Sequence, residues 1–288
     1  MKVAFASCAK IQDFPEQPAW QQIEDEQPDY LLLLGDNVYG SNNKRDIGEL
    51  RQRYEEQFDE PNFRSLVGNP QVKVHAIWDD HDFGTENEHG AEFDDEDYKT
   101  QAKDLFFEFM LFGQRDSAEA SEIYHAFEDE AADVKFIMLD NRLYSQEGGA
   151  ANTLLGEKQE AWFEEQLDQS QREITLVCAG LTLEGTKPVH EKWRDYKAYY
   201  DNITQAFREK GKVLFLSGDV HENAFVDHGG FFEAISSAVG RGGLIDTEIR
   251  NNYGIVEVND ESVDIRLCGV RDDDKINTSI DRATWTLR

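Results

Sequence analysis

Four short apolar runs in this sequence each end in side chains that can bind a metal ion. One run, Val213 to Leu216, is followed closely by Asp219 and His221. Apolar runs of this length, bounded by glycine and polar residues, are typical of buried strands. Because α/β folds place their ligands beyond the carboxyl ends of strands, we expect these ends to meet at one site. The other three runs lead to Cys8, to Asp36 with Asn37, and to Asp79, Asp80, His81 and Asp82.

Each of these aspartates, taken alone, has a simpler explanation. An aspartate after a strand often opens a turn or caps a helix, and Asp79 is a candidate for this role. Capping does not explain four such ends together, two of which carry histidine. We therefore favour a shared metal site, with capping left open for the individual residues.

The order of the expected elements predicts an α/β fold. A strand at Lys2 to Ala6, a helix within 17–26 and a strand at Tyr30 to Leu34 give a strand-helix-strand beginning. After Asp219 the expected strands are short and separated by glycines and acidic residues, which is typical of antiparallel sheet. No internal repeat or low-complexity linker divides the chain, so we expect one domain over residues 1–288.

The formal net charge of −30 limits the partners that this chain can have. Such a surface repels nucleic acid and anionic membranes, so no nucleic-acid binding is expected. Aromatic residues and apolar runs are plentiful, which argues against disorder. Acidity spread over the chain favours a protein that works in high salt, where self-repulsion is screened, and hence a marine or halophilic source. The alternative is a surface that binds cations weakly.

The cysteines and the apolar segments bear on the compartment. Three cysteines, far apart and odd in number, give no disulfide framework. No apolar stretch approaches the length of a membrane span, and no targeting segment precedes the first strand. We expect a cytoplasmic protein, or a periplasmic or secreted one if a signal peptide was removed. The sequence leaves the oligomeric state open.

The candidate donors differ in chemistry. Cys8 would bind as a thiolate and Tyr39 as a phenolate, which requires a strongly Lewis-acidic ion such as Fe³⁺. Carboxylates alone suit calcium, magnesium or manganese. A carboxylate between two ions can bridge them, and paired ions are the usual arrangement for in-line attack on phosphate. The carboxylate donors are Asp36, Asp80 and Asp219, and His221 is a borderline ligand.

Several motifs occur in an order that resembles one enzyme family. Gly35 to Tyr39 matches the Gly-Asp-x-x-Tyr motif of purple acid phosphatases and their relatives. The remaining motifs look more like the alkaline phosphatase D (PhoD-like) branch of the calcineurin-like metallophosphoesterases. They are Phe-Ala-Ser-Cys at 5–8, Trp-Asp-Asp-His-Asp at 78–82, Asp-Asn-Arg at 140–142, Leu-Gly-Glu-Lys-Gln at 155–159 and Ser-Gly-Asp-Val-His at 217–221.

This resemblance implies a four-layer α/β/β/α sandwich that hydrolyses phosphate esters at a metal cluster. It implies that Cys8, Asp36 and Tyr39 hold an iron-like ion, completed by Asp219 or His221. Asp36 would bridge to a second site that contains Asp80. His81 would be the leaving-group acid, with Asp82 orienting its ring, while Arg142 and Asn37 would contact the substrate phosphate. These roles agree with general chemistry, because imidazole beside carboxylate is an acid–base pair and guanidinium grips phosphate bidentately.

The sequence also departs from the wider superfamily. Asp79-Asp80-His81 stands where most relatives have Gly-Asn-His, and Asp219 replaces the first histidine of their Gly-His-x-His motif. The site is therefore poorer in nitrogen, which disfavours a zinc pair. It favours Fe³⁺ with a second divalent cation, calcium first, with manganese, magnesium or zinc as alternatives.

The leading hypothesis is a metal-dependent phosphatase or phosphodiesterase that acts on a small anionic phosphate ester. The alternative is a catalytically inactive, acidic metal-binding protein that keeps the fold. The other histidines are expected in core or solvent positions. His190 is the exception, because its loop follows a site strand and also carries Lys187 and Trp193.

Overall fold

The computed structural model describes residues 1–288 except 42, 111–120, 150–151, 189, 243–247 and 273–274. Its strands form two sheets, of seven and six strands. The larger has the order β13-β12-β11-β10-β1-β2-β3 and the smaller β4-β5-β6-β7-β9-β8. The larger sheet contains β1 (Lys2–Ala6), β2 (Tyr30–Leu34), β3 (Lys73–Ile77), β10 (Tyr253–Val258), β11 (Ser262–Cys268), β12 (Ile276–Asp281) and β13 (Thr286–Leu287). The smaller contains β4 (His125–Asp129), β5 (Val134–Met138), β6 (Ile174–Cys178), β7 (Val213–Ser217), β8 (Ala224–Asp227) and β9 (Phe232–Ile235).

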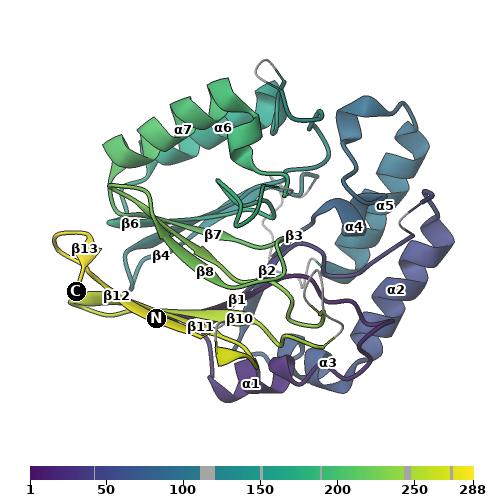
Figure 1. Ribbon diagram of the computed structural model, residues 1–288, viewed down its shortest axis with the longest axis horizontal. Coiled ribbons are helices and arrows are strands. Elements are labelled where there is room, and N and C mark those ends of the chain that lie inside the picture. Colours follow the sequence, from purple (N-terminus) through teal and green to yellow (C-terminus); the bar gives the residue numbers. More distant parts are fainter. Residues whose placement is uncertain (42, 111–120, 150–151, 189, 243–247, 273–274) are drawn as a thin grey trace.

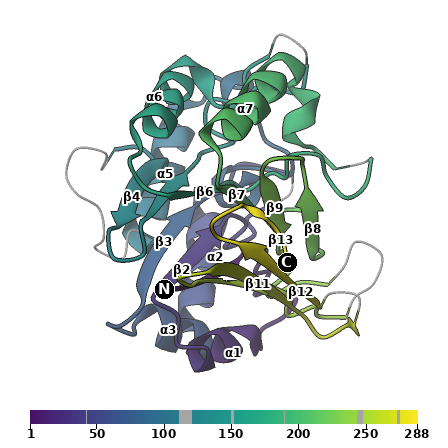
Figure 2. The same cartoon turned by 90° about the vertical axis from the view of Figure 1, so that its left-hand side faces the viewer.

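The two sheets lie face to face between two layers of helices, as Figures 1 and 2 show from two directions. Helices α6 (Gly156–Gln169) and α7 (Lys197–Lys210) cover the smaller sheet, and α1 (Ala19–Asp25) and α3 (Pro61–Val67) lie below the larger. Helices α2 (Ile47–Asp59), α4 (Asp80–Phe83) and α5 (Glu96–Met110) lie together beside the two sheets, on the right in Figure 1. Two short 3₁₀ turns complete the elements, η1 (Gly90–Glu92) and η2 (Trp193–Asp195). This arrangement confirms the expected α/β/β/α sandwich.

The buried side chains explain why these layers form. The helix layer over the smaller sheet is joined to it by an apolar cluster that includes Phe163, Phe207 and Phe215. On the opposite side, Trp20 of α1 meets Phe63 of α3 edge to face, with ring centroids 5.1 Å apart. Strands β2, β5, β6 and β7 are buried along their whole length, as continuous apolar runs predict. None of the described helices is long and apolar enough to cross a membrane.

The parallel register brings the carboxyl ends of the strands level. Ala6 pairs with Leu33 and Leu34 pairs with Ile77, so the turns after β1, β2 and β3 begin side by side. In the smaller sheet, Ser217 pairs with Ile235. Backbone hydrogen bonds then join the two sheets at this edge, since Ala238 N–H donates to the carbonyl of Ser7 at 3.1 Å.

Some elements were not predicted from the sequence. Helix α3 begins with Pro61 behind a Glu60 cap whose carboxylate accepts from Phe63 N–H at 2.6 Å. Helix α4 follows β3 directly, with Asp79 as its cap. Residues 83–97 contain η1 and the start of α5, which runs to Met110.

Candidate metal centre

The metal-type donors from the four strand ends lie together in the structure. Three groups each have ligand atoms within 4.8 Å of one another, and they share members. Asp36 belongs to two of the groups and Asp80 to two, so the three groups form one continuous cluster. The groups are Cys8, Asp36 and His221; Asp36, Asp80 and His81; and Asp79, Asp80 and Asp219.

The first half of the cluster, here called the sulfur half, consists of Cys8, Tyr39 and His221 around Asp36. The Cys8 thiol lies 3.4 Å from Asp36 Oδ2, which also accepts from the Tyr39 hydroxyl at 2.8 Å. The Tyr39 oxygen is 3.5 Å from His221 Nε2. Burial and the Asp36 carboxylate raise the pKa of both Cys8 and Tyr39 well above their usual ranges. A strongly Lewis-acidic ion is therefore needed to hold them as thiolate and phenolate.

The second half, here called the carboxylate half, consists of Asp79, Asp80 and Asp219. The Arg142 guanidinium binds Asp79 through Nε, and its Nη2 is 3.6 Å from Asp80. Burial opposes ionisation of Asp80, but Arg142 and His81 outweigh it and lower the pKa of that carboxyl. Burial and the Asp80 charge raise the pKa of Asp219 to about 8. Asp79 and Asp80 are buried and Asp219 is half-buried, so three ionised carboxylates beside one guanidinium would carry excess negative charge, which a bound cation would neutralise.

Four of the donors occupy an uncommon backbone conformation. Cys8, Asp36, Asp219 and His221 have φ angles of 61°, 51°, 64° and 54°. Non-glycine residues seldom adopt this left-handed region, and such outliers concentrate at functional sites. The turn after β2 adds Gly35 at φ +95°, where a Cβ would lie 2.6 Å from the Asp79 Cβ. The turns are thus built to hold donors at the strand ends at some conformational cost.

Unpartnered polar atoms give an independent test of whether this cluster fits metal ions. Within the described residues, Nδ1 of His221, Nδ1 of His81 and Oδ2 of Asp79 are buried without a hydrogen-bond partner. Such atoms are uncommon in folded proteins and call for an explanation. Ion ligation accounts for the atoms of His221 and Asp79, and the thiol and phenol donors of the sulfur half differ in chemistry from the carboxylates of the other half.

The contacts of Asp82 do not support its expected role. Its carboxylate accepts from the backbone N–H groups of Asn37, Val38 and Asp79 at 3.2, 3.2 and 3.0 Å. No hydrogen bond links Asp82 to His81 in the described part of the chain, and the His81 ring instead packs on Tyr39 with centroids 4.2 Å apart. Their adjacent positions in α4 point the two side chains in different directions. Asp82 therefore holds the surrounding loops, and no described hydrogen bond supports the expectation that it orients the His81 ring.

The side chains of Arg142 and Asn37 also form hydrogen bonds with other residues of the protein. Arg142 is fully buried, and besides Asp79 it donates to Glu191 through Nη1 at 2.8 Å. The Asn37 amide nitrogen donates to the Ile77 carbonyl at 2.9 Å and to Asp82 at 3.3 Å. The expectation that both side chains contact phosphate stays a prediction, which these contacts do not support. Only Nη2 of Arg142 lacks a hydrogen-bond partner, although it faces Asp80.

Several residues at the site were missed by sequence reasoning. For Asp79 capping was left open as an alternative to metal binding; it does cap α4, and it also belongs to the carboxylate half. Ser237 donates to the Cys8 sulfur at 3.1 Å across 229 residues, and Asn87 N–H donates to Asp80 at 2.6 Å. The Arg241 guanidinium lies 4.6 Å from the Tyr39 ring centroid. None of these carries a local motif, because each depends on how distant segments meet.

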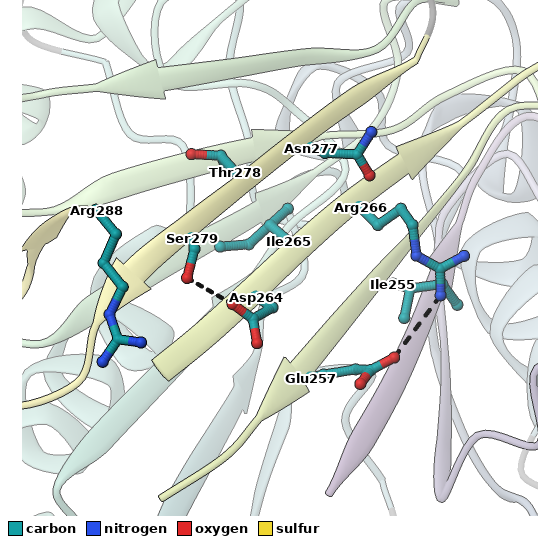
Figure 3. Close-up of a pocket in the computed structure, with 9 residues that line it drawn as sticks. All are labelled: Ile255, Glu257, Asp264, Ile265, Arg266, Asn277, Thr278, Ser279 and Arg288. Carbon is teal, nitrogen blue, oxygen red and sulfur yellow. Dashed lines mark hydrogen bonds and ion pairs between the residues drawn. The ribbon is translucent and has the colours of Figure 1, made fainter. Parts of the chain in front are cut away.

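Two hollows differ in their relation to this cluster. One, of about 520 Å³, is lined by Asn87 and Glu191, which bond to Asp80 and Arg142 respectively. The other, of about 430 Å³, lies over β10, β11 and β12 and is shown in Figure 3. Its charges pair with one another or with neighbours, as Arg266 does with Glu26 at 2.7 Å. No cluster donor lines either hollow, but two residues that line the first contact Asp80 and Arg142, so the first is the candidate substrate cavity.

Solved structures of low sequence identity share this fold. A structure of PhoD is 16% identical, with all of this chain and 71% of that chain covered and a TM-score of 0.79. A dimetal phosphatase from Danio rerio is 13% identical, covers 96% of this chain and 98% of its own, and has a TM-score of 0.66. GAP50, described as the anchor in the inner membrane complex of Plasmodium, is 12% identical, with 100% and 89% covered and a TM-score of 0.61.

Comparison with sequences decides the family. No curated protein matches the chain. A family model described as PhoD-like phosphatase matches residues 3–287, which is nearly the whole sequence. The match agrees with the motifs from Cys8 to His221 and with the α/β/β/α fold. The chain therefore belongs to the PhoD-like phosphatase family.

Proposed function

We propose that this phosphoric ester hydrolase uses Fe³⁺ in the sulfur half and a second divalent cation, calcium first, in the carboxylate half. Family membership establishes metal-dependent hydrolysis of phosphate esters. The observation that carries the finer proposal is the position of Asp36. Its carboxylate belongs both to the group with Cys8 and His221 and to the group with Asp80 and His81. A shared carboxylate of this kind can bridge two ions.

The donors divide between the two ions by chemistry. Cys8, Tyr39, Asp36 and His221 would hold the Fe³⁺, which stabilises thiolate and phenolate. Asp80 and Asp219, with Asp36 as the bridge, would hold the second ion, which oxygen ligands favour. When bound, the ions supply Lewis acidity and neutralise charge that develops on phosphate.

The chain's own residues have distinct parts in the reaction. His81, whose Nδ1 is buried without a partner, would donate a proton to the departing alcohol. Arg142 would keep Asp79 and Asp80 in place through its contacts with both. Asn37 and Asp82 would fix the loop between Asp36 and Tyr39, which positions the sulfur half.

The proposal is tested by removing the bridge. Asp36→Ala and chelation are each expected to abolish hydrolysis of p-nitrophenyl phosphate and of its bis ester, and elemental analysis should show that the variant loses both ions. The control is Asp168→Ala, an exposed aspartate on α6, which should behave as the unaltered protein does. Full activity in both the chelated protein and Asp36→Ala would refute the proposal. The ratio of the two rates in the unaltered protein separates monoester from diester preference.

A catalytically inactive metal-binding protein is the second candidate. The similar fold of GAP50 favours considering this candidate, because that protein is described as an anchor and not as an enzyme. His81→Ala separates the two, since the substitution should spare metal content in either case. Loss of turnover supports the hydrolase, whereas an unaltered protein with bound metal and no turnover on either ester supports the inactive alternative.

The acidic composition supports a further part of the proposal, that the protein works in high salt. With a net charge of −30, self-repulsion at low ionic strength should destabilise the folded state. Urea unfolding midpoints should rise as sodium chloride is increased from 0.1 to about 2 M, where the screening length falls to a few ångströms. Equal midpoints across this range would remove the halophilic interpretation.

A further inference from the structure

The cavity beside the carboxylate half is bordered by a loop that carries His190. The cavity lies next to the cluster because two of its lining residues, Asn87 and Glu191, contact Asp80 and Arg142. His190 is the neighbour of Glu191 in the sequence and lines the same cavity.

The His190 ring has one nitrogen engaged and one without a partner. Its side chain is nine-tenths buried, and Nδ1 lies 3.3 Å from the Thr186 hydroxyl. Nε2 is buried and makes no hydrogen bond to any described residue. Burial and the nearby Lys187 lower the pKa of His190, so the ring is neutral at pH 7. When Nδ1 accepts from Thr186, the ring proton resides on Nε2, which is then a free donor.

The loop that presents His190 is fixed on both sides. Backbone N–H groups of Trp193 and Arg194 donate to the carbonyls of Thr182 and Leu183 at 3.1 and 3.0 Å. Glu191 binds Arg142 through one oxygen and accepts from the Tyr196 hydroxyl at 2.7 Å through the other. A donor held in this way loses little entropy on binding a ligand, which is the requirement for a positioned contact.

We propose that this cavity receives the alcohol part of the phosphate ester and that His190 Nε2–H donates a hydrogen bond to the oxygen that links alcohol to phosphorus. The inference rests on the proposed function and adds a residue to it. As the oxygen of the attacking water bonds to phosphorus, the bond to the alcohol oxygen breaks and its electron pair passes to that oxygen. The departing oxygen takes a proton from His81, which recovers one from the attacking water, so His190 keeps its own proton and stays neutral throughout. Its hydrogen bond strengthens as negative charge develops on that oxygen.

The test compares two esters of similar shape and different leaving-group basicity. Phenyl phosphate expels the more basic oxygen and p-nitrophenyl phosphate the less basic one. In His190→Ala we expect kcat for phenyl phosphate to fall by about 100-fold, the size seen when one donor to a developing oxyanion is removed. The fall for p-nitrophenyl phosphate should be smaller, about tenfold or less, because less charge needs stabilising. His190→Gln keeps an N–H donor and should recover part of the loss.

The control is Lys197→Ala, an exposed residue of α7 outside the cavity lining, which should leave both rates unchanged. Equal losses on the two esters, unchanged rates in His190→Ala, or loss of bound metal in that variant would each overturn the proposal. Failure of His190→Gln to fold would show a packing role and overturn it as well. An unaltered protein that hydrolyses neither ester contradicts the proposed function instead, so the two failures are distinguishable.

Discussion

The two halves of the donor cluster solve the same problem of buried charge in different ways. The sulfur half surrounds one carboxylate, Asp36, with neutral groups whose protons can be displaced by an ion. The carboxylate half gathers Asp79, Asp80 and Asp219 and brings in the buried Arg142 against them. The first half gains full negative charge only when an ion binds, while the second holds an ionised Asp80 beside Arg142 and an Asp219 whose raised pKa keeps it protonated until an ion binds. This contrast is the basis for expecting different ions in the two halves.

The halves also differ in how the backbone places them. The sulfur-half donors Cys8 and His221, and the shared Asp36, all have positive φ and stand on turns after β1, β7 and β2. In the carboxylate half, Asp79 and Asp80 begin α4, and only Asp219 has this conformation. The sulfur half is therefore fixed mainly by main-chain geometry and the carboxylate half largely by side-chain pairing. Substitutions in one half should therefore remove the ion of that half and leave the ion of the other half bound.

The largest separable effect is expected from Cys8→Ser. A hydroxyl binds Fe³⁺ far more weakly than a thiolate at neutral pH, so the sulfur half should lose its ion while the carboxylate half keeps its own. Activity should fall by roughly 1000-fold, because several kcal/mol of Lewis-acid stabilisation disappear. Elemental analysis and the visible absorption band from ligand-to-iron charge transfer measure the loss. Cys268→Ser, at a half-buried position outside the cluster, is the control; equal loss of both ions would contradict independent halves.

Asp80→Asn is expected to have the opposite effect, which is weaker binding of the second cation with iron retained. The amide keeps the shape of the side chain but removes its charge, so the second divalent cation should bind at least tenfold more weakly while iron stays bound. Turnover should fall by roughly 100-fold at low calcium and recover in part when calcium is raised. Calcium titrations of activity, with iron content measured alongside, follow this change. Loss of iron in the same variant would mean that the two halves bind their ions together.

A smaller effect on the same half is expected from Arg142→Lys. Lysine keeps the charge but cannot maintain the contacts to Asp79, Asp80 and Glu191 together, since its ammonium is a point charge. Because Arg142 acts through the ligands, we expect about a 10- to 100-fold loss of affinity for the second ion, as is typical of groups that support metal ligands. Iron content and the absorption band should not change. An increase in KM without any change in metal affinity would instead indicate direct contact with the substrate.

The features that could be predicted from the sequence are those that apolar runs and short motifs indicate. Apolar runs such as 30–34 and 213–217 gave the buried strands, and the motifs around Asp36 and Asp219 gave the donors at their ends. Predictions from local patterns failed where a residue's contacts are made by distant segments of the chain. Adjacent positions made His81 and Asp82 look like an acid–base pair, but consecutive helical residues point their side chains about 100° apart. Similarly, the guanidinium of Arg142 looked available for phosphate until the fold placed Asp79 and Glu191 against it.

The short helices and the last strands were missed for a related reason. Helix α3 does carry a signal, Glu-Pro with the cap three residues before Phe63, yet it is too short for a clear apolar period. Strands β12 and β13 contain mostly polar residues and pair only at the edge of the larger sheet. Their pairing depends on β11 already being in place, which no pattern within their own residues describes.

The smallest effect on chemistry, with a clear effect on stability, is expected at Asp82, which connects the two halves. Its carboxylate joins the Asn37–Val38 loop of the sulfur half to Asp79 of the carboxylate half. Asp82→Ala would leave three buried N–H groups unpaired, at about 1–3 kcal/mol each, so the free energy of unfolding should fall by roughly 3 kcal/mol or more. Asp82→Asn keeps one acceptor oxygen and should lose less. Urea unfolding measures both, while turnover at low temperature should stay within about tenfold of the unaltered protein, as for other residues that only support ligands. If Asp82 oriented the His81 ring, Asp82→Asn would instead reduce kcat strongly with little loss of stability, because a neutral amide cannot support a charged imidazole.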